Sequence, residues 1–414
     1  MSTFSALGLA PDLVDALAAG GITSPFPVQT ATIPDALAGL DVCGRAPTGS
    51  GKTIAFGAPL VERVEKARPR RPSALILAPT RELAAQIARE LEPMAIARNR
   101  RVFTVYGGVG YEPQKRALRR GVEILVACPG RLEDLITQRA LSLDDVKFVV
   151  VDEADRMADM GFMPAVRRIL DQTNPDRQTL LFSATLDGDI AVLTRDYQKS
   201  PVRHEVEGVE SDGSEADHRF ERVRNEDRVE RVAEVIGAEG PTIVFCRTRH
   251  GADKVAKKLS QSGVPSAPIH GGLSQAKRDR ALAEFSRGRV HALIATDVAA
   301  RGIHVDDVAC VVHFDPPADT KSYIHRSGRT ARKGASGVVV SFILPDQVRD
   351  SLRLQRDLGF EVEGDAKRSR GQGDRPRSDR PRSERPDGAP ARRRGGPPKR
   401  GANHRGSRNP RATS

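Results

Sequence analysis

The sequence VVVDEAD at residues 149–155 decides how the rest of the chain is interpreted. Three consecutive β-branched residues predict a short buried strand, and acidic groups follow at its carboxyl end. In open α/β sheets ligands bind at the carboxyl ends of the strands, and in phosphate-handling proteins carboxylates at this place typically hold magnesium. The alternative is an acidic turn that caps the next helix, because Asp and Glu favour helix N-termini. This stretch alone favours neither interpretation.

A glycine-rich loop, APTGSGKT at residues 46–53, lies upstream and follows an apolar strand that ends at Cys43. Such a turn before a helix directs backbone N–H groups at phosphate oxygens. We expect Lys52 to neutralise the phosphates and the Thr53 hydroxyl to bind magnesium. The loop departs from the pattern G-x-x-x-x-G-K-[ST] at Ala46, although Gly49 supplies flexibility inside it. A chance Gly/Ser loop is the alternative.

Apolar runs alternate with helical segments along most of the chain. Helical periodicity over 81–94 and 252–259 separates candidate strands at 74–78, 102–105, 124–127, 148–151, 180–182, 242–246, 292–295, 308–314 and 338–343. This alternation predicts parallel sheets covered by helices on both faces. An acidic Gly/Ser-containing stretch at 204–217 reads as a linker. The sequence therefore predicts an α/β fold with domains at 1–203 and 218–362, of which the second has no lysine-bearing phosphate loop.

The C-terminal segment accounts for nearly all of the net charge. The 414 residues carry a formal charge of +12, and residues 365–414 contribute 16 Lys and Arg against 5 Asp and Glu. Without aromatic residues and with little apolar content, residues 363–414 are predicted to be a disordered basic tail. We expect the tail to bind nucleic acid electrostatically, with strong dependence on salt and none on sequence.

Four separated cysteines without a C-x-x-C pair predict buried reduced thiols and argue against a zinc site. Because no signal peptide and no run of ~18–20 apolar residues is present, we expect a soluble, cytoplasmic protein without membrane contact. No further apolar segment resembles an interface, so we expect a monomer.

Three polar features allow more than one interpretation. Gln29, held between prolines, is either a surface amide or a group that contacts a purine edge. The sequence SAT at 183–185 either caps a helix or links two sites. The run HRSGRTAR at 325–332 is either a solvated basic helix face or a source of arginines that reach a nucleotide bound by the other domain.

Together, these motifs resemble the DEAD-box RNA helicase family in order and spacing, from about residue 4 to residue 343. The resemblance rests on Gln29 and on the stretches 46–53, 79–84, 107–108, 129–131, 152–155, 183–185, 296–302 and 325–332. The chain is most similar to bacterial members of the RhlE type. The resemblance implies two RecA-like domains of the P-loop NTPase class (helicase superfamily 2), with a Q motif at about 4–34.

The resemblance also implies an RNA-stimulated ATPase that uses ATP and Mg²⁺ to unwind short RNA duplexes locally and to remodel RNA or RNA–protein complexes. The implied catalytic residues are Lys52, Glu153, Arg329 and Arg332, and the implied magnesium ligands are Thr53 and Asp152. The implied nucleotide contacts are Ile22, Gln29, Pro47, Thr48, Gly49, Ser50, Gly51, Lys52, Thr53 and His304. Asp155, Ser183, Thr185 and His325 would couple the domains.

Single-stranded and short duplex RNA would lie along residues of both domains, namely Pro79, Thr80, Arg81, Gly107, Gly108, Gly130, Arg131, Arg247, Gln275, Arg278 and Thr296. Contacts to sugar and phosphate would suit substrates of many sequences. Three positions depart from the family pattern: Ile22 replaces a frequent aromatic, Cys128 a threonine and His304 an aspartate.

Ribosomes or an RNA-degradation complex are conceivable partners of the tail. A non-catalytic RNA chaperone that acts through the tail and a DNA translocase are the competing functions.

Overall fold

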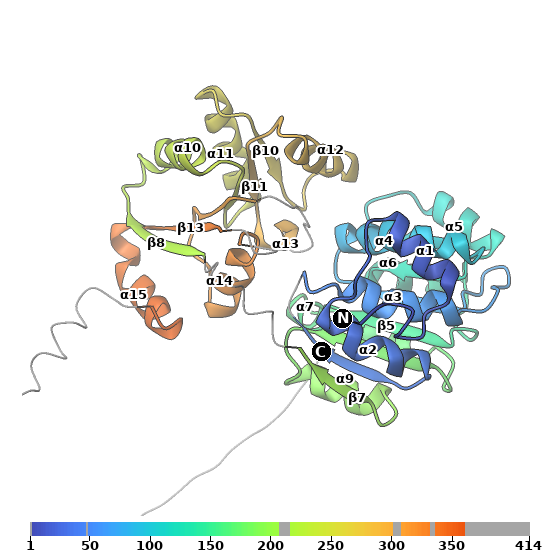
Figure 1. Cartoon of the computed structure of the whole chain (residues 1–414). Helices are drawn as coiled ribbons and strands as arrows, with labels where there is room; N and C mark the ends of the chain where they lie inside the picture. The colour runs from blue at the N-terminus through green and yellow to red at the C-terminus, as the bar shows by residue number, and fades with distance from the viewer. Residues whose placement is uncertain (1, 47–48, 207–215, 301–307, 332–335, 361–414) are drawn as a thin grey trace, which may run out of the picture. The chain divides into compact units, whose positions relative to one another are not determined.

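The structure, a computed structural model, describes residues 2–46, 49–206, 216–300, 308–331 and 336–360, without the side chains of 298 and 300. Residues 1–361 group into one unit, which contains two parallel sheets with helices on both faces (Figure 1). No helix among the described residues is long and apolar enough to cross a membrane.

The first sheet has the strand order β3-β4-β2-β5-β6-β1-β7, and every neighbouring pair is parallel. Its strands are β1 (Val42–Arg45), β2 (Ala74–Leu77), β3 (Val102–Val105), β4 (Ile124–Ala127), β5 (Phe148–Asp152), β6 (Gln178–Ser183) and β7 (Val202–Glu205). The strands β2, β4, β5 and β6 are buried along their whole length because helices cover both of their faces.

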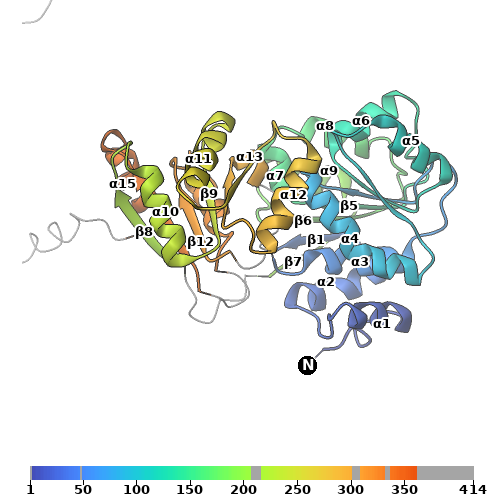
Figure 2. The same ribbon diagram turned by 90° about the horizontal axis from the view of Figure 1, so that it is seen from above.

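The helices of the first sheet are α1 (Pro11–Ala19), α2 (Pro27–Leu37), α3 (Lys52–Arg63), α4 (Arg81–Ala97), α5 (Tyr111–Arg120), α6 (Pro129–Thr137), α7 (Ala154–Asp159), α8 (Met163–Leu170) and α9 (Asp189–Tyr197). Residues of α1–α4 pack on one face of the sheet, and residues of α5–α9 pack on the other (Figure 2). Successive residues of β5 enter opposite cores, since side chains alternate along a strand: Val150 enters one, and Val149 and Val151 enter the other.

The second sheet has the order β10-β11-β9-β12-β13-β8 and is also parallel throughout. Its strands are β8 (Asp217–Arg222), β9 (Thr242–Phe245), β10 (Ser266–Ile269), β11 (Ala292–Ala295), β12 (Cys310–His313) and β13 (Val338–Ile343). Its helices are α10 (Arg228–Glu239), α11 (Arg249–Gln261), α12 (Gln275–Ser286), α13 (Asp297–Ala300), α14 (Thr320–Ser327) and α15 (Val348–Asp357), with a 3₁₀ turn at Pro345–Gln347. This sheet also has a separate core on each face.

The predicted α/β class and its two parallel sheets are therefore confirmed. The strands missed by sequence reasoning, β7, β8 and β10, lie at or next to the sheet edges, where partial exposure permits polar residues and weakens the apolar signal. Part of the predicted linker belongs to strands, because His204 and Glu205 lie in β7 and Asp217 opens β8. Residues 207–215 and the predicted tail lie outside the described residues, and the exact domain limits stay predictions.

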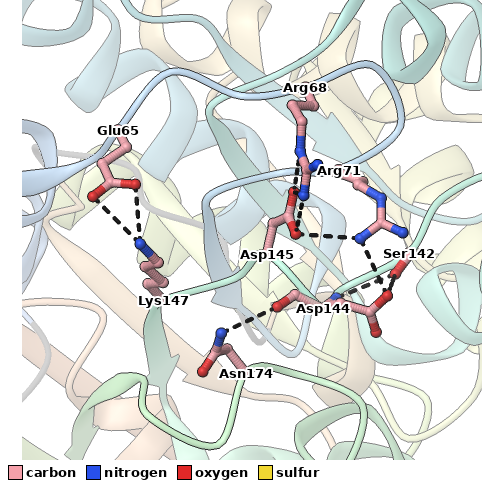
Figure 3. A network of polar contacts seen from close by, with 8 residues as sticks. All are labelled: Glu65, Arg68, Arg71, Ser142, Asp144, Asp145, Lys147 and Asn174. Atoms are coloured by element: carbon pink, nitrogen blue, oxygen red, sulfur yellow. Dashed lines mark hydrogen bonds and ion pairs between the residues drawn. The ribbon is translucent and has the colours of Figure 1, made fainter.

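A polar network holds the segments that lead into β2 and β5 (Figure 3). Arg68 forms hydrogen bonds of 2.6–2.8 Å with both carboxylate oxygens of Asp145, and Arg71 reaches Asp144 and Asp145 at 3.2–3.3 Å. These pairs tie the approach to β2 to the approach to β5. Both strands carry polar motifs at their opposite, carboxyl ends.

Candidate nucleotide and RNA site

The phosphate loop requires glycine at its last turn. Gly51 has φ +88° and precedes α3; a Cβ atom there would lie 2.5 Å from Gln29 Nε2 and 2.6 Å from Phe26 Cδ2. Lys52 begins α3 with a buried side chain whose Nζ donates to the Ala46 carbonyl at 2.8 Å. The loop therefore presents the beginning of a helix, with a lysine, to a ligand of negative charge. Pro47 and Thr48 lie outside the described residues.

Gln29 connects the N-terminal segment to this loop. Its Nε2 donates to the Gly51 carbonyl at 2.9 Å, and its Oε1 accepts the Phe26 N–H at 2.8 Å. Gln29 is buried, so the interpretation of a surface amide is wrong. The amide keeps a second N–H and a second lone pair, and the predicted contact with a purine edge stays a prediction.

The acidic end of β5 is a buried cluster of charge. Asp152 Oδ1 accepts the N–H of Glu153 at 3.0 Å, and Arg156 of α7 forms an ion pair with Glu153, which immediately precedes that helix. Burial raises the pKa of Asp152. Burial alone would also raise the pKa of Glu153, but Arg156, with Arg329 and Lys52 nearby, lowers it overall. Glu153 is therefore held as a carboxylate.

Ser183, at the end of β6, contacts the acidic stretch directly. Its hydroxyl accepts the N–H of Asp155 at 3.2 Å and that of Thr185 at 3.4 Å. Asp155 is the second residue of α7, so this contact caps that helix and also joins the end of β6 to the segment after β5; both interpretations of the segment stay open.

A cavity of about 460 Å³ brings many of the predicted nucleotide residues together: it is lined by Ile22, Gln29, Gly49, Gly51, Lys52, Thr53, Asp152 and Glu153. This volume suits a nucleotide-sized ligand. A smaller cavity is lined by Lys52, Glu153, Asp155, His325 and Arg329, so residues from both sheets meet there. Ser50 is half-buried in the loop, and His304 and Arg332 lie outside the described residues.

The predicted RNA residues of the first sheet gather after β2, β3 and β4. Thr80 caps α4 by accepting the Leu83 N–H at 3.3 Å, and Pro79 precedes it. The Arg81 guanidinium lies against Gly108, leaving no space for a Cβ atom there. Arg131, on the first turn of α6, donates to the Val109 carbonyl at 2.9 Å and stacks on Tyr111. The exposed Gly130 precedes it, and Gly107 precedes Gly108.

In the second sheet, Arg247 follows β9 and Thr296 follows β11. Arg278 and Gln275 lie on α12, where both contact Glu82 of α4: Arg278 at 2.9 Å and Gln275 at 3.2 Å. Arg278 and Glu82 are each less than one-tenth exposed. The sequence analysis includes Glu82 in the stretch 79–84 but does not predict this pairing, because the partners of Glu82 are almost 200 residues away in the chain. In this arrangement the Arg278 guanidinium neutralises the buried Glu82 carboxylate. The contact of Arg278 with RNA stays a prediction.

Two parallel sheets, one carrying a phosphate loop beside buried carboxylates, are typical of an α/β protein that binds nucleotides. The DEAD/DEAH box helicase family matches residues 26–192, and the helicase conserved C-terminal domain family matches 227–334. Together these two matches cover β1–β6 of the first sheet and β9–β12 of the second.

Similar proteins agree with this class. The DEAD-box ATP-dependent RNA helicase CshA of Geobacillus kaustophilus is 38% identical over 365 residues, covering 88% of this chain and 78% of that protein. The DEAD-box ATP-dependent RNA helicase 30 of Arabidopsis thaliana is 40% identical over 367 residues, 86% of this chain but only 62% of the plant protein. The structure of S. cerevisiae Dbp5 bound to RNA and ADP BeF3 matches with a TM-score of 0.78 at 28% identity, covering 87% of this chain and 95% of that one.

The chain belongs to the DEAD-box ATP-dependent RNA helicase family, and the resemblance inferred from its motifs is confirmed. It is an ATPase of that family. The narrower assignment to the RhlE type stays a prediction.

Proposed function

We propose that this protein uses ATP and Mg²⁺ to separate short RNA duplexes locally and to remodel RNA or RNA–protein complexes. The observation that carries the proposal is the cavity that collects the phosphate loop, Gln29 and the buried carboxylates of β5. ATP and RNA would each favour a closed state in which the two sheets contact each other. Bound ATP would therefore raise the affinity of the protein for RNA, and bound RNA would raise its affinity for ATP.

The residues at the cavity fit magnesium. The Thr53 hydroxyl and the Asp152 carboxylate are hard oxygen ligands, which this ion prefers, and with so few protein ligands water and phosphate would fill most of its coordination shell. The bound ion would offset negative charge on the phosphate oxygens. Burial of Asp152 favours its protonated form, so a cation beside it would stabilise the ionised form.

The chemical step is assigned to residues around Glu153. As a carboxylate, Glu153 would orient the attacking water and take up its proton. Lys52 would bind the phosphates, and Arg329 and Arg332 would stabilise the charge that develops on the transferring phosphoryl group. Asp155, Ser183, Thr185 and His325 would transmit contact between the sheets to this carboxylate.

RNA is assigned to the strand ends after β2, β3, β4, β9 and β11, where backbone and arginine groups would contact sugar and phosphate. The basic tail would add affinity without sequence preference. Ribosomes or an RNA-degradation complex would be partners of the tail. The protein would act as a monomer. Its cytoplasmic location stays a prediction.

The first experiment compares stimulation of ATP hydrolysis by RNA and by single-stranded DNA of the same sequence. We expect RNA to stimulate and DNA to have little effect. Equal stimulation by both would favour a DNA translocase instead.

The second experiment deletes residues 365–414. The ATPase should keep its stimulation by RNA while its RNA affinity falls and becomes less dependent on salt, because phosphate contacts have been removed. A truncated protein that still hydrolyses ATP but has lost all RNA remodelling would favour a chaperone acting through its tail.

A further inference from the structure

The nucleotide cavity has a polar wall that the predicted motifs do not include. Besides the phosphate loop and the segment before α2, it is lined by Leu83, Gln86 and Glu90, all on α4. Gln86 and Glu90 are one helical turn apart, so they share a face of the helix. Neither has a role in the site described above.

The two side chains form a connected pair with unused acceptors. Gln86 Nε2 donates to Glu90 Oε1 at 2.6 Å. Gln86 Oε1 is buried and has no hydrogen-bond partner among the residues that the structure describes. A buried acceptor without a partner is costly and calls for an explanation, and a hydrogen-bond donor on a ligand supplies one. The Glu90 carboxylate has further lone pairs beyond the one that Gln86 uses.

The kind of donor follows from the charges that surround the cavity. A phosphate group would be repelled by Glu90, and Lys52 and Thr53 mark the phosphate end of the cavity instead. Gln29 and Ile22 mark the end assigned to the base. The part of a nucleotide between base and phosphates is the sugar, whose adjacent hydroxyls offer two donors to two acceptors.

We propose that Gln86 and Glu90 form a sugar-recognition pair, in which the Gln86 carbonyl and the Glu90 carboxylate accept hydrogen bonds from the ribose hydroxyls of the bound nucleotide. The proposal rests on the assignment of this cavity to ATP. It makes the pair a determinant of specificity for ribonucleotides, separate from the residues that act on the phosphates.

The test measures RNA-stimulated hydrolysis of ATP, 2′-deoxy-ATP, 3′-deoxy-ATP and purine riboside triphosphate, which lacks the exocyclic amine of adenine. It compares the unaltered protein with Glu90→Ala and with the milder Glu90→Gln, which keeps a neutral acceptor. Glu92→Ala is the matched control, because Glu92 is exposed on the same helix and does not line the cavity.

In the unaltered protein, we expect kcat/KM for ATP to exceed that for at least one deoxy analogue by about tenfold, the effect of a hydrogen bond to a charged group. Glu90→Ala should raise KM for ATP by about tenfold, leave kcat nearly unchanged and remove this discrimination. Glu90→Gln should keep part of the discrimination, and Glu92→Ala should behave like the unaltered protein.

Three outcomes would overturn the proposal. The unaltered protein could fail to distinguish the sugars, or Glu90→Ala could keep the full discrimination. Alternatively, Glu90→Ala could erase only the difference between ATP and purine riboside triphosphate, which would place the contact on the base. None of these outcomes affects the proposed function, which fails if RNA does not stimulate hydrolysis of ATP by the unaltered protein or if single-stranded DNA stimulates it equally.

Discussion

Six strands of the first sheet have the same order as the six strands of the second, and β7 has no counterpart, so the shared positions can be compared one by one. β1, β2 and β5 of the first sheet occupy the places that β8, β9 and β12 occupy in the second. Glu153 follows β5 and Asp315 follows β12, and the strand registers place these two carboxylates at corresponding positions. Glu153 forms an ion pair with Arg156, whereas Asp315 binds Arg228 at 3.0 Å and the N–H of Arg247 at 2.8 Å.

In both sheets the fold places a carboxylate at the carboxyl end of a central strand. The residues around that carboxylate determine whether it lines a nucleotide cavity or forms ion pairs within the fold. In the first sheet a glycine-rich loop after β1 lies beside the acidic strand end, and together they line the nucleotide cavity. In the second sheet no such loop follows β8, and the equivalent carboxylate fixes arginines of its own domain. Arg326 is likewise held by Asp297, at 2.6 and 2.8 Å.

The largest effect is expected from Glu153→Gln, which removes the carboxylate assigned to the chemical step. We expect kcat to fall by about 10²–10⁴-fold while ATP still binds. The control is Asp315→Asn at the matching place in the second sheet, which should lower the melting temperature but change kcat little. An equal loss of kcat in both variants would contradict the assignment of hydrolysis to the carboxylate of the first sheet and of a structural role to that of the second.

The next effect concerns the buried pair of Arg278 and Glu82. Arg278→Met leaves a buried carboxylate without its partner, which costs about 3–5 kcal/mol where the pair is fully formed. We expect the RNA concentration needed for half-maximal ATPase to rise more than about tenfold. Arg280→Met, on the exposed side of the same helix, should have little effect.

The salt dependence of RNA binding distinguishes this pair from a direct RNA contact. Loss of a phosphate contact reduces the slope of log affinity against log salt by about one, whereas loss of the pair with Glu82 leaves the slope unchanged. A reduced slope would restore the original assignment of Arg278 to RNA.

A smaller effect should appear on acidification. Complete burial lowers the pKa of His313 well below its ordinary value of 6.5, and Arg326 and His218 act in the same direction. Its Nδ1 pairs with Ser341 at 2.9 Å, and its ring packs edge-on against Tyr323. Because the unfolded chain takes up a proton near pH 6.5 and the folded chain does not, the second sheet should lose about 1.4 kcal/mol per pH unit below that value.

The first sheet should lose stability only in stronger acid, because the raised pKa of Asp152 acts in the opposite direction as the pH falls. Burial alone would raise the pKa of Glu123, but hydrogen bonds from Arg101 and Ala67 lower it overall, below its ordinary value of 4.5. Its contribution to stability is present above that value and is lost as the pH falls through the lowered pKa. Calorimetry between pH 7.5 and 5 should therefore show the second sheet weakening first, and His313→Asn should flatten this response.

The smallest effect is expected from Arg68→Ala in the network of Figure 3. The Arg68 side chain is 69% exposed, so its ion pair with Asp145 is screened by solvent. We expect a loss of at most about 1 kcal/mol in the free energy of unfolding, measured by urea denaturation. A larger loss of unfolding free energy would mean that the pair of Arg68 and Asp145 stabilises the segment before β5 more than the exposure of Arg68 indicates.

Sequence reasoning succeeded where one local signal determines the structure. The apolar runs of β5 and β13 predict buried strands, and the glycine pattern before Lys52 predicts a phosphate loop. It failed where partial exposure hides a strand, as in β8, and where partners are distant in the chain, as for Glu82. Gln86 and Glu90 were missed because the apolar residues of α4 define its buried face, so its other face reads as solvent-exposed.

The backbone at Glu153 has a consequence for how this protein can change. Its φ of +50° lies in the left-handed region, which glycine adopts without penalty and glutamate does not. A glycine at this position would relieve about 1–2 kcal/mol of strain and would remove the carboxylate assigned to hydrolysis. At position 153, therefore, selection for higher folding stability and selection for ATP hydrolysis act in opposite directions.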